Sequence, residues 1–507
     1  MKLLTWFVLL TILTVGGVAA ASDPYRTIEY WELVRSPGGN SLASLLDRGE
    51  PAVAARAALA LGRTGKLLAA DPLLQHTQAS DAAIRAMAIY GLGLLAPSLS
   101  GQGLTVMLRP LAADRKVRAA TAIVGALSDG SDAVRIAALD ATARFANAKA
   151  LSPQLTSTSF ERVTHVLRAD ASTVIRGRAA YTLAWYDPAD TTIHPRALRA
   201  LETAFAAEDD AGARWHEMWA LGRSFAKQVS AKTLTAGLAD ESDVVRIMTL
   251  HALERRKDTS WIARVQPLTN DANWRVNEEA REAIAQMRGG KRTEHLKAIP
   301  AGVVTPSPSA SPEFSPLPRP KIAVPAAAPK AAQLALSPRI LPRTIADMTG
   351  PMPGPHPRVA LVTTQGTIVV VLYPEWAPST VANFLNLAKS GYYDNNRWFR
   401  IVPDFVVQSG DKTNTGDGGV KYTIPAEENP IDQDTGIISM GLEYGKDGAK
   451  RDSAGSQFYI TLSPQPHLDM AFTVFGHVES GYDVLGRLVE SDRIIRMEQL
   501  PAENLGG

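Results

Sequence analysis

The chain has 507 residues, more than one hydrophobic core usually supports, so two or more domains are expected. Its 53 basic residues nearly balance its 51 acidic residues and form no dense basic stretch, which disfavours a nucleic-acid partner. Because the chain has no cysteine, thiol catalysis, cysteine-ligated zinc, disulfides and a lipidated N-terminal cysteine are excluded.

The first residues predict export from the cytoplasm. Lys2 precedes an uncharged apolar run that ends at Val18, and three alanines at 19–21 suit signal cleavage. We interpret residues 1–21 as a signal peptide and expect the mature protein in a bacterial periplasm. The alternative is an uncleaved N-terminal anchor that leaves the rest of the chain facing the periplasm. No other segment is apolar enough to predict a membrane span.

Residues 22–295 repeat a short phrase in which a hydrophobic residue and an arginine precede small residues. The arginines of its copies are Arg56, Arg85, Arg118, Arg135, Arg176 and Arg246, with weaker copies around Arg214 and Arg275. Apolar residues follow at three- and four-residue spacing, which predicts helices. Tandem helical hairpins bury their faces against one another, so an all-α solenoid is expected, and the phrase resembles HEAT repeats.

We expect these arginines to bridge neighbouring repeats through carboxylates and carbonyls, and not to bind a ligand. The 17-residue step from Arg118 to Arg135 breaks the period.

Proline then recurs through residues 296–357, which predicts a semi-rigid linker, with a docking site for a proline-binding partner as the alternative.

Residues 358–500 change to alternating patterns. Gln365-Gly366 is typical of a hairpin turn between two strands. Pro378 can open a helix that continues to Lys389, and a second helix is expected over 482–489. Hairpin strands with two helices predict a closed antiparallel barrel, followed by a tail at 501–507.

One segment of this region places Arg400, Phe405 and Gln408 close together in sequence. Pro403 would have to bend or bulge the strand to bring them to one face, because residues 400 and 405 differ by an odd number. A cation, an aromatic ring and an amide, without a nucleophile or a carboxylate, suit a reaction that breaks no covalent bond.

The same segment resembles the signature of the cyclophilin-type peptidyl-prolyl isomerases. Gly391-Tyr-Tyr-Asp and Arg400-Ile-Val-Pro-Asp-Phe-Val-Val-Gln-Ser-Gly-Asp carry the likeness. Further motifs follow in the family's order: Gly436-Ile-Ile-Ser-Met-Gly, Ser456-Gln-Phe-Tyr-Ile, His467-Leu-Asp and Phe472-Thr-Val-Phe-Gly. The resemblance implies an enzyme that acts on proline-containing polypeptides without a cofactor or a metal ion.

The resemblance also implies roles for particular side chains. The implied catalytic residues are Arg400, Phe405, Gln408 and Gln457. The implied substrate-binding residues are Val406, Gly441, Leu442, Tyr459, His467, Leu468 and Phe472. His467 stands where cyclosporin-sensitive members carry tryptophan, so weak sensitivity is expected. Gly416–Gly419 lacks the lysine and the serine or threonine of a phosphate-binding loop and is interpreted as a turn.

We therefore expect a prolyl isomerase that assists the folding of exported proteins, with the solenoid recruiting clients or partners. Phe399, Leu442, Tyr459 and Phe472 depart from the family's usual residues. These departures leave open an alternative, a non-catalytic module that binds proline peptides on a HEAT-repeat scaffold.

Overall fold

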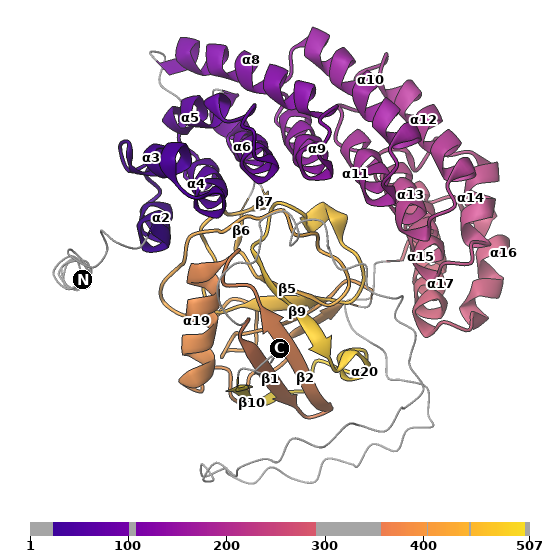
Figure 1. Cartoon of the computed structure of the whole chain (residues 1–507). Helices are drawn as coiled ribbons and strands as arrows, with labels where there is room; N and C mark the ends of the chain where they lie inside the picture. Colours follow the sequence, from indigo (N-terminus) through magenta and orange to yellow (C-terminus); the bar gives the residue numbers. More distant parts are fainter. Residues whose placement is uncertain (1–23, 101–107, 291–355, 403, 446–447, 502–507) are drawn as a thin grey trace, which may run out of the picture.

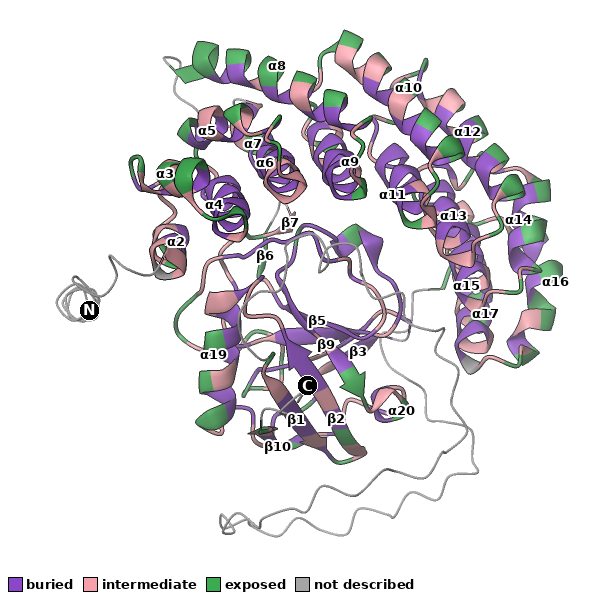
Figure 2. Cartoon of the chain, in the orientation of Figure 1, coloured by how far each residue is buried: buried purple, intermediate pink, exposed green. Residues whose placement is uncertain are grey.

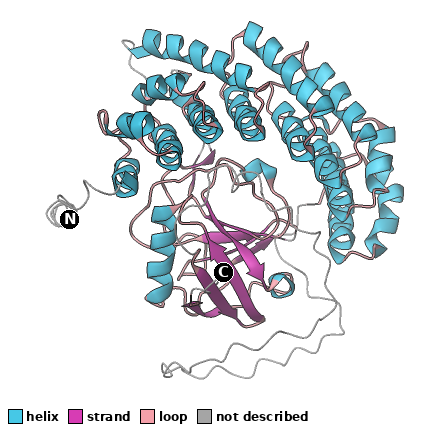
Figure 3. Ribbon diagram, in the orientation of Figure 1, coloured by secondary structure: helices cyan, strands magenta, loops and turns pink. Residues whose placement is uncertain are grey.

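The computed structural model describes residues 24–100, 108–290, 356–402, 404–445 and 448–501. They form a helical domain (24–290) and an antiparallel barrel (356–501) (Figure 1). Strands occur only in the second part of the described chain (Figure 3), so the predicted class of an all-α domain joined to an antiparallel barrel is confirmed. The proposed signal peptide, nearly all of the proline-rich linker and the end of the tail lie outside the described residues.

The helical domain consists of short and medium helices in close succession. They are α2 (Pro24–Leu33), α3 (Ser41–Arg48), α4 (Pro51–Arg63), η1 (Leu67–Ala69), α5 (Ala70–Gln75), α6 (Ala82–Leu94), α7 (Ala96–Leu99), α8 (Arg109–Ala126), α9 (Asp132–Asn147), α10 (Pro153–Ala169), α11 (Thr173–Leu183), α12 (His194–Ala207), α13 (Ala211–Phe225), α14 (Ala231–Leu238), α15 (Asp243–Arg256), η3 (Thr259–Trp261), α16 (Ile262–Val265), η4 (Gln266–Asn270) and α17 (Trp274–Met287). Among the helices described, none is both long enough and apolar enough to span a bilayer.

Alternate helices of this domain form two layers. In the inner layer each helix packs on the next, in the order α4, α6, α9, α11, α13, α15 and α17. The outer layer contains α5, α8, α10, α12 and α14. Figure 1 shows that the stack curves around the barrel, and Figure 2 shows mostly buried residues along the inner helices. Assignment of the stacked pairs to HEAT repeats stays a prediction.

The recurring arginines tie consecutive inner helices together. Each pairs with an acidic residue in the turn before the next inner helix, at N–O distances of 2.6–3.1 Å. The pairs are Arg85–Asp129, Arg135–Asp170, Arg176–Glu208, Arg214–Asp240 and Arg246–Asp271. Each arginine also donates to a backbone carbonyl in the turn before its own helix. The predicted bridging role is therefore confirmed for these five.

Two irregularities of the repeat have structural explanations. Arg118 lies on the outer helix α8 and Arg135 on the inner helix α9, so the short step between them joins two helices that pack together. Arg275 of α17 does not continue the series. Its guanidinium instead donates to Asp404 of the barrel at 2.6 Å, and both side chains are buried.

The barrel is one curled antiparallel sheet with the strand order β10-β1-β2-β9-β5-β8-β4-β3. Its strands are β1 (Arg358–Thr363), β2 (Gly366–Leu372), β3 (Arg400–Val402), β4 (Val406–Ser409), β5 (Ile437–Met440), β8 (Phe458–Thr461), β9 (Val474–Ser480) and β10 (Ile494–Gln499); a separate pair is β6 (Tyr444–Gly445) with β7 (Gly448–Ala449). The edges meet through a bridge between Arg397 and Arg493, and the amide of Trp398 donates to the Asp492 carbonyl at 3.1 Å. The barrel thus closes through a short stretch rather than through full strand pairing.

Helices and aromatic packing complete the barrel. α19 (Pro378–Lys389) matches the predicted helix, whereas α20 (Tyr482–Leu485) ends well before the predicted residue 489. The predicted hairpin is present between β1 and β2, and Gly366 takes φ +134°, which favours glycine. Phe384, Phe458 and Phe475 are fully buried and pack against one another in the core.

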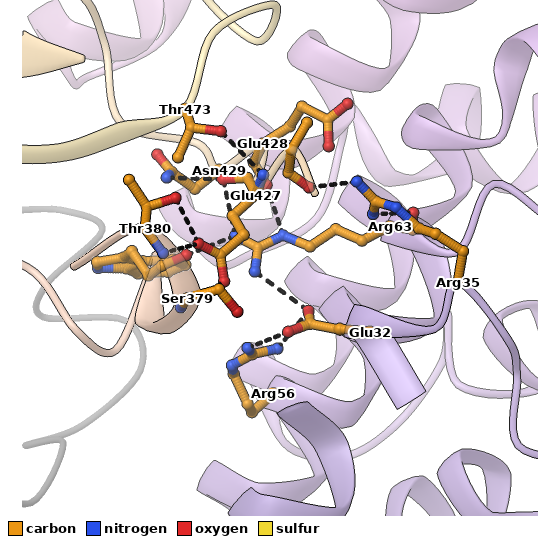
Figure 4. Close-up of polar contacts among 12 residues, drawn as sticks. Glu32, Arg35, Arg56, Arg63, Ser379, Thr380, Glu427, Glu428, Asn429 and Thr473 are labelled. Carbon is orange, nitrogen blue, oxygen red and sulfur yellow. Dashed lines mark hydrogen bonds and ion pairs between the residues drawn. The ribbon is translucent and has the colours of Figure 1, made fainter. Parts of the chain in front are cut away.

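The two domains share a buried seam. Trp376 and Met470 of the barrel belong to the same apolar cluster as the helical domain's core. Arg63 of α4 is fully buried and donates to the Trp376 carbonyl at 2.7 Å. It also donates to the Glu428 carbonyl at 2.8 Å (Figure 4). Its remaining nitrogen pairs with Glu32 at 3.1 Å. The contacts explain why the inner helices face the barrel.

Candidate active site

A tight β-hairpin brings the predicted arginine and glutamine together. Arg400 on β3 lies directly opposite Gln408 on β4, and Gln408 lies opposite Tyr459 on β8. The expectation of one bent strand is wrong, because residues 400–402 and 406–409 form two antiparallel strands. Pro403 itself lies outside the described residues. Asp404 takes φ +55° in this turn, a left-handed conformation that aspartate tolerates better than most residues.

Two glutamines orient the guanidinium. Both amide hydrogens of Gln457 are used, since its Nε2 donates to the carbonyls of Gly416 (2.8 Å) and Gly418 (2.7 Å). Its Oε1 therefore accepts from Gln408 Nε2 at 2.9 Å, which leaves Gln408 Oε1 facing Arg400 Nη1 at 3.4 Å. The network fixes the orientation of both amide groups, so that the oxygen of Gln408 and not its nitrogen faces Arg400.

The loop behind Gln457 is itself held in place. The carboxylate of Asp411 accepts hydrogen bonds from the amides of Gly416 and Gly418 and from Thr413. Burial raises the pKa of Asp411, but these hydrogen bonds outweigh it and leave the pKa below its usual value. Residues 416–419 lie in a loop with bends at 416 and 417. No sequence pattern indicated that the carbonyls of this loop orient Gln457.

An apolar cluster lies beside this polar relay. It contains Val406, Tyr459, Leu468 and Phe472, each at most 6% exposed, with Phe405 and Leu442 partly buried at its edge. The Arg400 guanidinium carbon lies 5.3 Å from the Phe405 ring centre, a cation–π distance. The structure therefore brings the implied catalytic residues next to this group of implied substrate-binding residues.

Gly441 lies against both glutamines. A Cβ at this position would come within 3.2 Å of Gln457 Cβ and 3.3 Å of Gln408 Nε2, tighter than ordinary contact. Its amide donates to the Gln457 carbonyl at 2.8 Å. The glycine thus leaves room for the side chains of Gln408 and Gln457. Its implied role in substrate binding stays a prediction.

Tyr459 carries a hydroxyl at the base of the cluster. The oxygen is buried, and no described residue makes a hydrogen bond to it at normal distance and angle, although Ser439 and Gln433 lie near it. Burial raises the pKa of Tyr459 well above its usual value, so the hydroxyl stays protonated. A buried hydroxyl needs a hydrogen-bond partner, and none of the described residues supplies one at normal distance and angle.

Comparison with known proteins identifies the barrel. Residues 358–500 match the family described as cyclophilin type peptidyl-prolyl cis-trans isomerase/CLD. The chain is 42% identical over 147 residues to the peptidyl-prolyl cis-trans isomerase CYP18-2 of Arabidopsis thaliana, which spans 28% of this chain and 86% of that protein. This chain belongs to the cyclophilin-type peptidyl-prolyl cis-trans isomerase family.

Two further proteins are similar to parts of this chain. Peptidyl-prolyl cis-trans isomerase B of Bacillus subtilis is 45% identical over 123 residues, covering 24% of this chain and 82% of that protein. A crystal structure of a cyclophilin type isomerase of Cryptosporidium parvum is 28% identical, covers 29% of this chain and 98% of its own, and has a TM-score of 0.27. The family match leaves the helical domain outside the cyclophilin domain.

The helical domain nevertheless reaches the cyclophilin site. His467, on η5 (Pro466–Leu468), is exposed and stacks on Phe405 with ring centres 5.5 Å apart. Surrounding protein atoms, and then the cations Arg255 and Arg223 of the helical domain, lower the pKa of His467 to about 4. The imidazole is therefore neutral near pH 7, which is compatible with the substrate-binding role implied for His467.

The helical domain also holds the two turns that flank the apolar cluster. Asp404 precedes Phe405 and binds Arg275, while Asp469 follows Leu468 and accepts from Arg178 at 3.2 Å. The Arg144 guanidinium adds a hydrogen bond to the Met470 carbonyl at 2.8 Å. The sequence did not reveal these contacts, since their partners are more than a hundred residues apart.

Proposed function

We propose that the cyclophilin domain catalyses cis–trans isomerisation of X-Pro bonds in extended polypeptides. The observation that carries the proposal is the placement of Arg400. Its guanidinium is oriented by the glutamine relay at the edge of an apolar cluster, and none of the described carboxylates forms an ion pair with it. A charged donor is thus available where a proline ring would be buried.

The reaction requires only that the twisted peptide bond be bound better than either planar isomer. Rotation about an X-Pro bond has a barrier of about 20 kcal/mol, which comes largely from lost amide resonance. At the twisted midpoint the proline nitrogen regains its lone pair and becomes a hydrogen-bond acceptor. A donor aimed at that nitrogen selectively stabilises the twisted state. A turnover of about 10 per second requires on the order of 4–5 kcal/mol, within reach of one desolvated guanidinium.

Each side chain of the site has a role in this scheme. Phe405 and the apolar cluster bury the proline ring, and Arg400 donates to the nitrogen. Gln408 and Gln457 hold Arg400 at the correct angle and bind the backbone of the substrate. Arginine keeps its charge at all relevant pH values, so no general acid or base is needed.

The proposal extends to clients and location. The apolar N-terminal run favours export, so unfolded exported proteins in a periplasm are the proposed substrates. The inner helices α13 and α15 bring cations close to His467, so a polypeptide bound in the site would also meet the helical domain. We propose that this domain retains clients there or recruits a protein partner.

A protease-coupled assay on an Ala-Pro peptide tests the activity. Arg400→Ala should lower kcat/KM by roughly 10²–10³-fold, the usual effect of losing one donor to a transition state. Arg397→Ala, an equal change at an exposed arginine three residues earlier, is the matched control and should leave the rate unchanged. Equal rates for the intact protein, the Arg400 variant and buffer would contradict the proposal.

The rival function is a non-catalytic module that binds proline peptides. The dense packing of the cluster favours it, since Phe472 packs edge-on against Tyr459 at 5.8 Å. Exchange broadening in NMR spectra of a bound peptide separates the two. An enzyme broadens the cis and trans signals of the proline residue, whereas a pure binder shifts them without exchange.

A further inference from the structure

Three side chains of metal-binding type meet in the seam between the domains. His251 of α15 and Glu279 of α17 come from the helical domain, and Asp404 comes from the β3–β4 turn of the barrel. One ligand atom from each lies within 4.8 Å of the others. His251 Nε2 is 3.0 Å from Glu279 Oε1 and 3.7 Å from Asp404 Oδ2.

The cluster is largely buried, and two of its ligand atoms lack a well-aligned hydrogen bond from the described residues. The side chains of Glu279 and Asp404 are 2% and 3% exposed, and that of His251 is 16% exposed. Asp404 Oδ2 is buried and accepts no hydrogen bond from the described residues, and His251 Nε2, also buried, faces the Glu279 and Asp404 oxygens without a well-aligned hydrogen bond. Buried polar atoms without partners are rare because each loses its hydrogen bonds to water, so a missing ligand is a direct explanation.

Arg275 distinguishes the two oxygens of Asp404. Its guanidinium donates twice to Oδ1, at 2.6 and 3.1 Å, and makes no such contact with Oδ2. This fork turns the second oxygen toward His251 and Glu279. An outer group that orients a carboxylate in this manner is a common feature of metal sites.

We propose that His251, Glu279 and Asp404 form a binding site for a divalent metal ion of the zinc class. Imidazole and carboxylate are ligands that Zn²⁺ accepts at roughly 2.0–2.2 Å, which places ligand atoms about 3–4 Å apart around the ion. The distances from His251 Nε2 to the two carboxylate oxygens fall in that range. The two carboxylates and the Arg275 guanidinium together carry a net charge of −1, so the cluster attracts a cation.

The ion would link the helical domain to the catalytic turn. Asp404 is adjacent to Phe405, so an ion held by all three residues fixes the start of β4 relative to α15 and α17. Its binding does not depend on isomerase activity, so direct measurements test it. The alternative occupant of the cluster is a proton, with a charged His251 paired to both acids.

Calorimetric titration of Zn²⁺ into the full chain, after treatment with a chelator, is the primary test. We expect one equivalent to bind and the unfolding temperature to rise by several degrees at saturating Zn²⁺. Mn²⁺ and Mg²⁺ serve as further probes, with Mg²⁺ weakest because it retains its water. Absence of saturable Zn²⁺ binding would overturn the proposal in favour of the proton.

Substitutions locate the site. Glu279→Gln and His251→Gln should each weaken Zn²⁺ binding at least 100-fold, while Glu278→Gln, the same change at the half-exposed neighbour, should leave it unaltered. Circular dichroism verifies that each variant folds, and the d–d absorption of bound Co²⁺ reports the ligands directly. A Co²⁺ spectrum and an affinity unchanged by His251→Gln would overturn the assignment even if the protein binds zinc elsewhere.

Discussion

Arginine has opposite roles in the two halves of the molecule. In the helical domain Arg63 is fully buried, and its nitrogens are bonded to carbonyls and to Glu32. In the cyclophilin domain Arg400 is half-buried and makes one long hydrogen bond of 3.4 Å. The first holds structure together, whereas the second keeps donors available for a ligand.

The groups around an arginine decide whether it holds the structure together or stays available to bind a ligand. Acidic residues and free carbonyls surround the helical-domain arginines, so each finds a fixed partner. Neutral amides and aromatic rings surround Arg400, so it is oriented without being neutralised. Both halves also contain buried polar groups without a hydrogen bond from the described residues, among them Glu217 in the helices and Tyr459 in the barrel.

The largest expected effect is on stability, at Arg63. Arg63→Met removes a buried cation and leaves the Trp376 and Glu428 carbonyls without their donor. We expect the free energy of unfolding to fall by about 3–5 kcal/mol, as is usual when one partner of a buried ion pair is lost. Scanning calorimetry measures this, with Arg48→Met at an exposed position as the control. Equal midpoints for both variants would mean that the seam contributes little.

Glu217 breaks the pairing rule of the helical domain. Its carboxyl group is fully buried, with no hydrogen bond from the described residues, and burial raises its pKa from 4.5 to about 9. The folded protein therefore binds more protons than the unfolded chain between these values. The free energy of unfolding should fall as pH rises from about 5 to 9.

Glu217→Gln should remove this pH dependence and raise the free energy of unfolding by ~2 kcal/mol at pH 8. Urea unfolding at pH 6 and pH 8.5 measures both effects, and Glu161→Gln, at an exposed position, supplies the matched control. A slope that persists in the Glu217 variant would show that another group titrates.

Sequence patterns predicted the site better than the seam. Arg400, Phe405 and Gln408 lie in one motif, so their proximity followed from the resemblance. Their geometry did not, because alternation over three- and four-residue strands cannot distinguish a bent strand from the hairpin through Asp404. The relay to the Gly416 and Gly418 carbonyls also escaped prediction, since backbone acceptors leave no mark in a sequence.

The helical class and the bridging arginines were predictable because the helices repeat their apolar spacing and their arginines. The docking of the two halves was not. Arg178 meets Asp432 across 254 residues and Arg63 meets Glu428 across 365, and no local pattern encodes such distances. The same separation hid the cluster of His251, Glu279 and Asp404, which no ligand spacing could reveal.

Arg400→Lys sharpens the comparison by keeping the charge and removing the planar fork. Lysine cannot meet Gln408 and the proline nitrogen with the same geometry, so we expect kcat/KM to fall about 10-fold, or ~1.4 kcal/mol. The unfolding midpoint should not change. The protease-coupled assay measures the rate, and Arg397→Lys is the control. A rate equal to that of the intact protein would indicate that charge alone suffices.

The smallest expected effect concerns Tyr459. Its buried hydroxyl has no hydrogen bond from the residues described, so Tyr459→Phe removes an unsatisfied group while it keeps the ring against Phe472. We expect the free energy of unfolding to rise by about 1 kcal/mol and KM for an Ala-Pro peptide to stay equal or fall. Urea unfolding measures the gain, with Tyr444→Phe at an exposed position as the control. A less stable Phe variant would mean that the hydroxyl is bonded, and that the barrel, like the helices around it, leaves few buried polar groups unpaired.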